Sequence, residues 1–185
     1  PGVRKMKKIL ATILALVLAI GVTTMAWATE TAAEKVAKVG ETEYATLQEA
    51  VNAADGKTVQ LLQDVTASIT IESGKTVTLD LNGKTLTNED GQHTITNNGT
   101  LTIVDTSAAK SGTVDNVTHA KGAIVNYGVT VLNGGTFERS QEKGTYSPYG
   151  NGGNSWYTIA NYGKMEINAG VTVYNNGGYS SMIRN

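Results

Sequence analysis

The chain has no cysteine, two prolines and few aromatic residues, which make up 6% of its 185 positions. Without cysteine, disulfides, thiolate metal sites and cysteine nucleophiles are all excluded. Charged residues make up 17% and the formal net charge is −1, which argues against a nucleic-acid-binding surface. Apolar residues make up 40%, too many for a typical disordered chain. The abundance of Thr, Asn and Gly indicates many short strands joined by tight turns.

The segment 1–28 has the three parts of a secretory signal. Basic residues precede an apolar run at 9–22, and the small triplet Ala-Trp-Ala follows at 26–28. Because the run is shorter than the roughly 20 residues that span a bilayer, we expect cleavage before Thr29, with Met6 as the natural start. The protein is therefore predicted to be secreted or held at the cell surface. It would contact a membrane only through this segment, if the segment stays uncleaved.

Removal of the signal leaves an acidic chain. Four of the 15 basic residues and none of the 16 acidic residues precede Thr29, so the remaining chain has a net charge of −5. Such a chain is not expected to bind nucleic acid or an anionic membrane surface. We expect a polar linker and a first strand, near Val39, at 29–43, and one folded domain at 44–185.

One helix is predicted, at 46–54. Thr46 and Glu49 have the spacing of a capping box, in which the Thr side chain accepts a backbone N–H bond and the Glu side chain reaches back. The pair Asp-Gly at 55–56 is typical of a helix end. The apolar residues that share one helical face are Leu47, Ala50, Val51 and Ala54.

The motif Ile-x-Asn-x-Gly recurs through the second half of the chain. Complete copies lie at 95–99, 124–128 and 159–163, and a fourth begins at 183–185. A second apolar alternation, expected to be buried, follows each complete copy: Leu101 and Ile103, Val129 and Val131, Met165 and Ile167. A constant motif at unequal spacing indicates stacked coils with loops of varying length, which is a solenoid. The alternative is an antiparallel meander, which would favour two-residue hairpin loops at even spacing.

The asparagine of each motif copy is predicted to meet its counterpart on the next coil. A side-chain amide ladder would then join Asn97, Asn126, Asn161 and Asn185. The glycine two positions later lets the backbone turn without a Cβ clash. Tyr127 and Tyr162 occupy equal places in two copies, so we expect their rings to stack on each other.

Four stretches resemble the right-handed parallel β-helix proteins of the pectate-lyase-like superfamily, and more narrowly its non-catalytic, adhesin-like surface proteins from Gram-positive gut bacteria. The stretches are 44–50 (YATLQEA), 76–85 (TVTLDLNGKT), 133–137 (NGGTF) and 154–159 (NSWYTI). The resemblance implies an all-β, right-handed parallel β-helix, with the helix at 46–54 covering its N-terminal end. No matching cap follows the coil begun at 183–185, so we expect an incomplete C-terminal end and a longer full protein.

The superfamily also contains enzymes, so the alternative function is that of a degenerate or partial polysaccharide lyase or glycoside hydrolase. Such enzymes use calcium-binding acids with a basic residue, or clustered aspartates near a histidine. The candidate residues in this sequence are Asp80, Asp105, Asp115, His93 and His119.

These candidates do not form a recognisable active site in the sequence. Hydrolysis needs paired carboxylates, and acids of this region stand within two positions of each other only at 89–90, a predicted turn. We expect Asp80 to be a solvated surface residue, Asp105 to cap a turn, and both histidines to lie in surface loops. The sequence therefore predicts no catalytic residue, no metal ligand and no cofactor.

Aromatic residues gather late in the chain, where seven of the eight tyrosines lie between 127 and 179. Aromatic rings set among polar groups can pack on the apolar faces of sugars, although they can equally pack a loop onto the wall of the fold. The candidate ligand-binding residues are Tyr146, Tyr149, Trp156 and Tyr157. We expect a non-enzymatic surface module that binds polysaccharide, host or plant surface glycans, or proteins.

Threonine pairs suggest a third function, ice binding. The pairs lie at 76/78, 85/87, 94/96 and 100/102. A flat threonine array can order water, but only if the pairs lie in register on one wall. Because these pairs sit before and after different turns within about one coil, we expect them on different walls, as ordinary outward strand residues.

Overall fold

The computed structural model of the chain describes residues 33–88, 90–140, 156–175 and 181–185. Within these ranges the protein is mostly β-strand with one helix, α2 (Leu47–Ala53). No helix among them is long and apolar enough to cross a membrane. The signal predicted at 1–28 lies outside the described residues.

All seventeen described strands belong to three sheets, which we call A, B and C, and the fifteen strands from β3 to β17 are divided equally among them. Sheet A holds β3 (Lys57–Leu61), β6 (Thr76–Asp80), β9 (Thr100–Val104), β12 (Val129–Leu132) and β15 (Lys164–Ile167). Sheet B holds β4 (Val65–Thr66), β7 (Thr85–Thr87), β10 (Thr113–Asp115), β13 (Gly135–Arg139) and β16 (Val171–Asn175). Sheet C holds β5 (Ile69–Ile71), β8 (Ile95–Asn97), β11 (Ile124–Asn126), β14 (Ile159–Asn161) and β17 (Ile183–Arg184).

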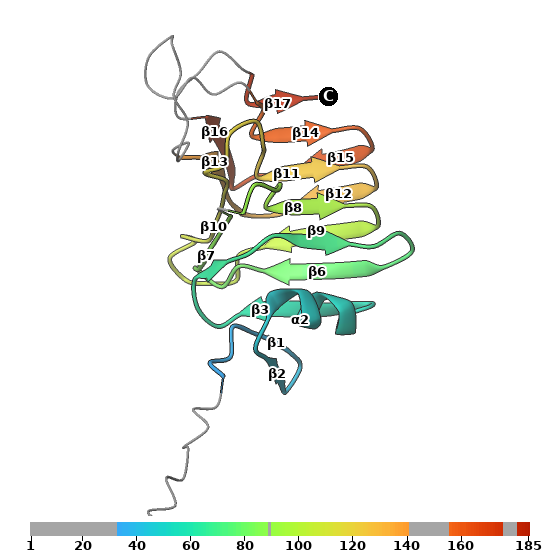
Figure 1. Cartoon of the computed structure of the whole chain (residues 1–185), viewed down its shortest axis with the longest axis vertical. Coiled ribbons are helices and arrows are strands. Elements are labelled where there is room, and N and C mark those ends of the chain that lie inside the picture. Colours follow the sequence, from blue (N-terminus) through green and yellow to red (C-terminus); the bar gives the residue numbers. More distant parts are fainter. Residues whose placement is uncertain (1–32, 89, 141–155, 176–180) are drawn as a thin grey trace, which may run out of the picture. The chain divides into compact units, whose positions relative to one another are not determined.

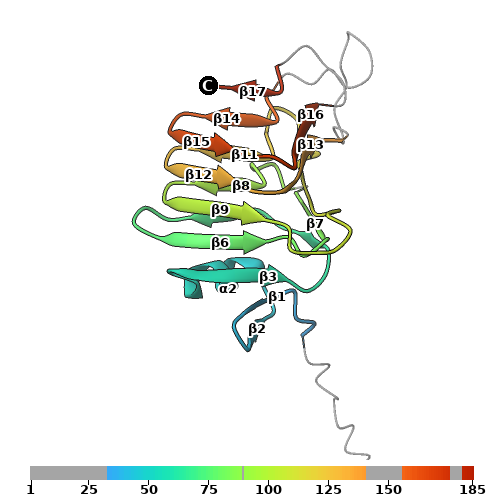
Figure 2. The same ribbon diagram turned by 180° about the vertical axis from the view of Figure 1, so that it is seen from behind.

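The chain visits the three sheets in the same order, A then B then C, five times between β3 and β17. We call each such visit a circuit. Every pair among these strands is parallel and joins a strand to the one three elements later. Figure 1 shows the strands of sheet C one above another, with sheet B at the left, and Figure 2 shows sheet A from behind. This pairing is not that of an antiparallel meander.

The first circuit is covered by elements from the start of the described chain. Strands β1 (Ala37–Val39) and β2 (Thr42–Tyr44) extend sheet A in antiparallel pairing. The helix α2 begins after the predicted cap, because the Thr46 hydroxyl oxygen accepts from the Glu49 N–H at 3.3 Å. Its Leu47, Ala50 and Val51 are buried.

Gln48 of α2 satisfies the edge of sheet C. Its Oε1 accepts from the Thr70 N–H at 2.8 Å, and its Nε2 donates to the Thr70 carbonyl at 3.0 Å. The side-chain amide thus makes both bonds that a neighbouring strand would make to β5. Exposed strand edges invite aggregation, so this contact protects the first strand of sheet C.

Inward side chains form columns that run through all five circuits. The column of sheet C is Ile69, Ile95, Ile124, Ile159 and Ile183. The column of sheet A is Val59, Leu79, Ile103, Leu132 and Ile167. The column of sheet B is Val65, Leu86, Val114, Phe137 and Val173. The first four members of each column are buried, so stacking creates a core that no single circuit could form.

The prediction that Val129 and Val131 face the core is wrong. Thr130 is fully buried, whereas the side chain of Val129 is 38% exposed. The polar residue is held inside by the neighbouring asparagines, because Thr130 Oγ1 donates to Asn126 Oδ1 at 2.9 Å and accepts from Asn97 Nδ2 at 3.0 Å.

The motif asparagines form a continuous chain of amide hydrogen bonds beside the apolar column of sheet C. Asn97 Nδ2 donates to Asn126 Oδ1 at 2.8 Å, and Asn126 Nδ2 donates to Asn161 Oδ1 at 2.7 Å. Asn161 Nδ2 donates to Asn185 Oδ1 at 2.6 Å. The first three are buried, and each bond links one circuit to the next, so we call these four residues the asparagine ladder.

Glycine is required at the corner that follows the ladder. A Cβ added to Gly128 would lie 2.0 Å from the carbonyl oxygen of Gly99, and one added to Gly163 would lie 2.1 Å from that of Gly128. The circuits therefore touch through backbone atoms at the corner from sheet C to sheet A.

The expectation that the threonine pairs fall on different walls is wrong for two of the four pairs. Thr76 pairs with Thr100, and Thr78 pairs with Thr102, both on the outward face of sheet A. The two pairs are 24 residues apart, which is one circuit, so strands β6 and β9 place them side by side. The other two pairs lie on β7 of sheet B and next to or on β8 of sheet C.

Replacing Asn126 by alanine should lower the free energy of unfolding by about 2–4 kcal/mol, because the buried amides of Asn97 and Asn161 each lose one hydrogen bond. Denaturant unfolding followed by circular dichroism measures this change. Asn168→Ala is the matched control, because its 2.7 Å bond to Asn133 also joins two circuits but is exposed. We expect the control to change stability by no more than about 0.5 kcal/mol. Equal losses in the two variants would contradict a stabilising role for the buried ladder.

Candidate functional site

Asp80 is not the solvated surface residue that the sequence suggested. It is 2% exposed, at the corner where β6 leaves sheet A. Its carboxylate accepts from Thr106 N–H at 3.0 Å, from Thr106 Oγ1 at 2.6 Å and from Gln60 Nε2 at 2.8 Å. Burial raises the pKa of Asp80, but the bonds from Thr106 and Gln60 outweigh it and hold the pKa below its usual value. The Asp80 carboxylate is therefore ionised, and its hydrogen bonds link neighbouring circuits.

Asp105 caps a turn, as expected. Oδ1 accepts from Ser107 N–H at 3.1 Å and from Gly83 N–H at 2.9 Å, and Oδ2 accepts from Gly112 N–H at 2.6 Å. Burial raises the pKa of Asp105, and the bonds from Gly112, Ser107 and Gly83 lower it below its usual value. Asp80 and Asp105 therefore stabilise the A-to-B corners of neighbouring circuits, and their oxygens are already occupied by protein donors.

Strand register creates one carboxylate pair that the sequence reasoning missed. Asp115 of β10 lies directly beside Glu138 of β13 on sheet B. The Asp115 carboxylate accepts from Ser140 N–H at 2.9 Å and from Ser140 Oγ. Burial, followed by the charge of Asp115, raises the pKa of Glu138, and Glu138 Oε2 is buried without a hydrogen-bond partner. A repeated Gly-Thr-apolar-acid pattern at 112–115 and 135–138 could have revealed this pair.

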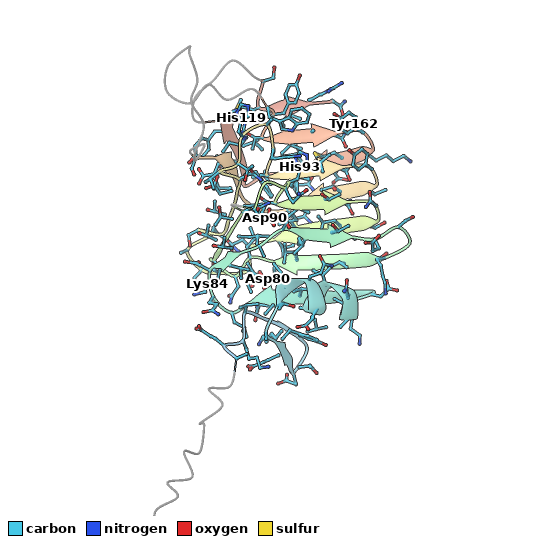
Figure 3. The ribbon with its side chains drawn as sticks, viewed as in Figure 1. Asp80, Lys84, Asp90, His93, His119 and Tyr162 are labelled. Atoms are coloured by element: carbon cyan, nitrogen blue, oxygen red, sulfur yellow. The ribbon has the colours of Figure 1, made fainter. Side chains whose placement is uncertain are left out.

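The acids and histidines suggested as catalytic are not gathered into one site. Figure 3 shows Asp80 and His93 at different heights in the stack of strands. No group of three or more histidine, cysteine or acidic side chains that could hold a metal ion occurs among the described residues. Calcium usually takes six to eight oxygen ligands, so the Asp115–Glu138 pair alone does not make a calcium site.

His93 is only partly a surface residue. It is half-buried, its Nδ1 accepts from the Gly122 N–H at 2.9 Å, and its ring centroid lies 5.9 Å from that of Trp156. Burial, followed by the charge of Lys121, lowers the pKa of His93 to about 4, so the imidazole is neutral at pH 7. His119 is exposed, as expected. His93 therefore bonds to the backbone through Nδ1 and packs against Trp156.

Two of the four aromatic residues suggested for ligand binding lie within the described residues. Tyr146 and Tyr149 lie outside them. Trp156 is half-buried between His93 and Tyr157, with ring centroids 5.9 and 5.8 Å away. Its carbonyl oxygen accepts from Arg139 Nη1 at 3.1 Å and from Asn175 Nδ2 at 3.2 Å. These contacts pack Trp156 onto the wall of the fold.

A more exposed aromatic group lies at the corner from sheet C to sheet A. The Tyr127 and Tyr162 rings stack with centroids 5.3 Å apart and planes 10° apart, and they are 56% and 47% exposed. The Arg184 guanidinium carbon lies 5.1 Å from the Tyr162 ring centroid and 5.7 Å from that of Tyr157. Arg184 Nη1 also donates to the Tyr162 hydroxyl at 3.1 Å. We call Tyr127, Tyr157, Tyr162 and Arg184 the aromatic corner.

The chemistry of the aromatic corner follows from the stacking. Stacking covers the facing ring surfaces of Tyr127 and Tyr162, but the two side chains remain 56% and 47% exposed and carry phenol hydroxyls. Arg184 adds guanidinium N–H donors beside them. The corner can therefore pack against C–H groups and exchange hydrogen bonds with a hydroxyl-rich ligand. The equivalent of Tyr127 one circuit earlier is Asn98, so the aromatic surface is confined to the later circuits.

No protein-family model matches the chain, and no curated protein or solved structure matches it either.

Replacing Glu138 by glutamine should raise the free energy of unfolding at neutral pH. Because folding raises the pKa of Glu138, ionisation of this side chain disfavours the folded state. The stability that the protonated side chain allows below its ordinary pKa of 4.5 is lost as the pH rises through its higher pKa in the folded protein. The gain in stability should be largest at pH 7 and above. It should vanish near pH 3, where a protonated Glu138 is as neutral as the glutamine that replaces it. Denaturant unfolding across this range measures it, with Glu72→Gln, at an exposed turn, as control. A gain that does not depend on pH would contradict this account.

Proposed function

We propose that the chain is a non-enzymatic, adhesin-like module of a secreted or cell-surface protein, which binds glycans or proteins through side chains displayed on a rigid scaffold. The proposed scaffold is a right-handed parallel β-helix of the pectate-lyase-like type, with α2 as its N-terminal cap. Five circuits in parallel, in-register pairing support this fold. The contacts of Gln48 with Thr70 support the capping role of the helix.

The aromatic corner is the observation that carries this proposal. Tyr127 and Tyr162 are large, exposed and held rigid by their mutual stacking and by Arg184. A surface that is already ordered loses little conformational entropy when a ligand binds. Exposed aromatic rings, phenol hydroxyls and guanidinium donors together suit the mixture of C–H and hydroxyl groups that sugars offer.

The state of the acidic residues supports a binding module over an enzyme. The oxygens of Asp80 and Asp105 accept hydrogen bonds from the protein itself. In the Asp115–Glu138 pair, Ser140 bonds to Asp115, and Glu138 Oε2 is shielded from solvent. A general acid must reach the glycosidic oxygen of its substrate, which the shielded Oε2 of Glu138 does not do.

Retention on a panel of immobilised polysaccharides tests glycan binding, with the chain from Thr29 onward as the protein. On any polysaccharide that retains the wild type, Tyr162→Ala should weaken binding about threefold to tenfold. The substitution removes one ring and the contacts that Arg184 makes with it. Tyr174→Ala is the matched control, because Tyr174 is a 40% exposed tyrosine on β16 of sheet B. We expect the control to bind as the wild type does.

Two outcomes would contradict this proposal. One is equal retention of the wild type and a folded Tyr162→Ala variant. The other is release of unsaturated products from pectin in the presence of calcium, which would make the lyase alternative the better account. Circular dichroism melting curves of all three proteins separate loss of binding from loss of folding.

A further inference from the structure

The outward face of sheet A carries a two-column array of β-branched side chains. One column is Thr58, Thr78, Thr102 and Val131, and the other is Thr76, Thr100 and Val129. Adjacent members of a column come from neighbouring circuits and are paired in register. Along each strand, the residues of the array alternate with buried residues, so all seven side chains point away from the core.

The spacing of this array is fixed by the sheet. Neighbouring strands lie about 4.8 Å apart, and residues two positions apart along a strand are separated by about 6.6–6.8 Å. Threonine and valine have few χ1 rotamers, so their methyl and hydroxyl groups repeat with the backbone. Thr76, Thr78, Thr100 and Thr102 therefore form a regular two-dimensional array, which Val129 and Val131 extend with methyl groups alone.

The threonine hydroxyls of the array are available to water. Among the described residues, no hydrogen bond involves the hydroxyl of Thr58, Thr76, Thr78, Thr100 or Thr102, although the backbone groups of these strands are paired. Each hydroxyl can thus bind a water molecule, and the adjacent methyl group limits how freely that water can be arranged. The waters over the array would then repeat with the spacing of the sheet.

The array is uncharged across β6, β9 and β12, and charged side chains enter its columns only on β15, as Lys164 and Glu166. Asp80 lies on β6 beyond the two columns, but it is buried and bonded to Thr106. A neutral, regular surface is complementary to a neutral, regular ligand. Charged side chains would instead hold strongly ordered hydration shells of their own.

We propose that this face of sheet A binds ice, with Thr76, Thr78, Thr100 and Thr102 holding water in a lattice that joins the crystal. Sheet B lacks a second uncharged column of this kind. There Thr85, Thr113, Thr136 and Thr172 form one threonine column, but its neighbour contains Asp115, Glu138 and Tyr174. The array and the aromatic corner share no residue, so the inference does not depend on glycan binding.

Ice recrystallisation inhibition and thermal hysteresis test the proposal, with the chain from Thr29 onward compared with an inert globular protein at equal concentration. The wild type should slow ice-crystal growth. Thr102→Lys, which places a charge between Thr78 and Val131, should require at least about tenfold more protein for the same effect. Thr113→Lys is the matched control, because Thr113 lies between Thr85 and Thr136 in the single column of sheet B. It should keep the wild-type activity.

A second variant tests the array by gain of activity. Changing both Val129→Thr and Val131→Thr adds a third hydroxyl-bearing row at positions whose side chains already point outward. This variant should increase the activity, a result that loss of folding cannot mimic. Wild-type protein that does not affect ice growth, equal losses in the two lysine variants, or no gain in the double variant would each overturn the proposal.

Discussion

A buried asparagine side chain can satisfy its donors and acceptor in only one register of the stacked strands. The asparagine ladder repeats that constraint in successive circuits, and each bond joins residues that are 24 to 35 positions apart. A shift by one residue would expose the amides and bury their neighbours. The ladder therefore sets the register of sheet C, and the corner glycines, which let circuits touch through backbone atoms, transmit that register to sheet A.

The outer surface inherits its regularity from this inner constraint. In-register stacking places Tyr127 against Tyr162 and aligns the threonine columns of sheet A. It also places Asp115 beside Glu138, a like-charged pair that opposes folding above the ordinary pKa of Glu138. The same geometry thus produces an aromatic corner, a neutral lattice and an acidic pair on different parts of one scaffold. The polar atoms of Asp80 and Asp105 serve the scaffold itself.

Local sequence patterns were sufficient for features that lie within one circuit or within the repeated motif. The Thr46 cap, the turn at Asp105, the asparagine column and the tyrosine stack all follow from residue types at short or repeated spacing. Burial of Asp80 and Thr130, the Asp115–Glu138 pair and the shared wall of Thr76 and Thr100 could not be predicted in the same way. Each depends on which residues meet between circuits, and loops of unequal length hide that register from the sequence.

Spin-label distances test the central claim, the in-register stacking of five circuits, most directly. Because the chain lacks cysteine, cysteines introduced at position 58 and at 131 or 166 would carry the only labels. These positions are paired through successive strands of sheet A, so the Cα separations should be about 14 Å and about 19 Å, one strand spacing apart. Label distances that increase by that step would agree with the stacking. Equal distances, or a shorter distance for the 58–166 pair, would contradict it.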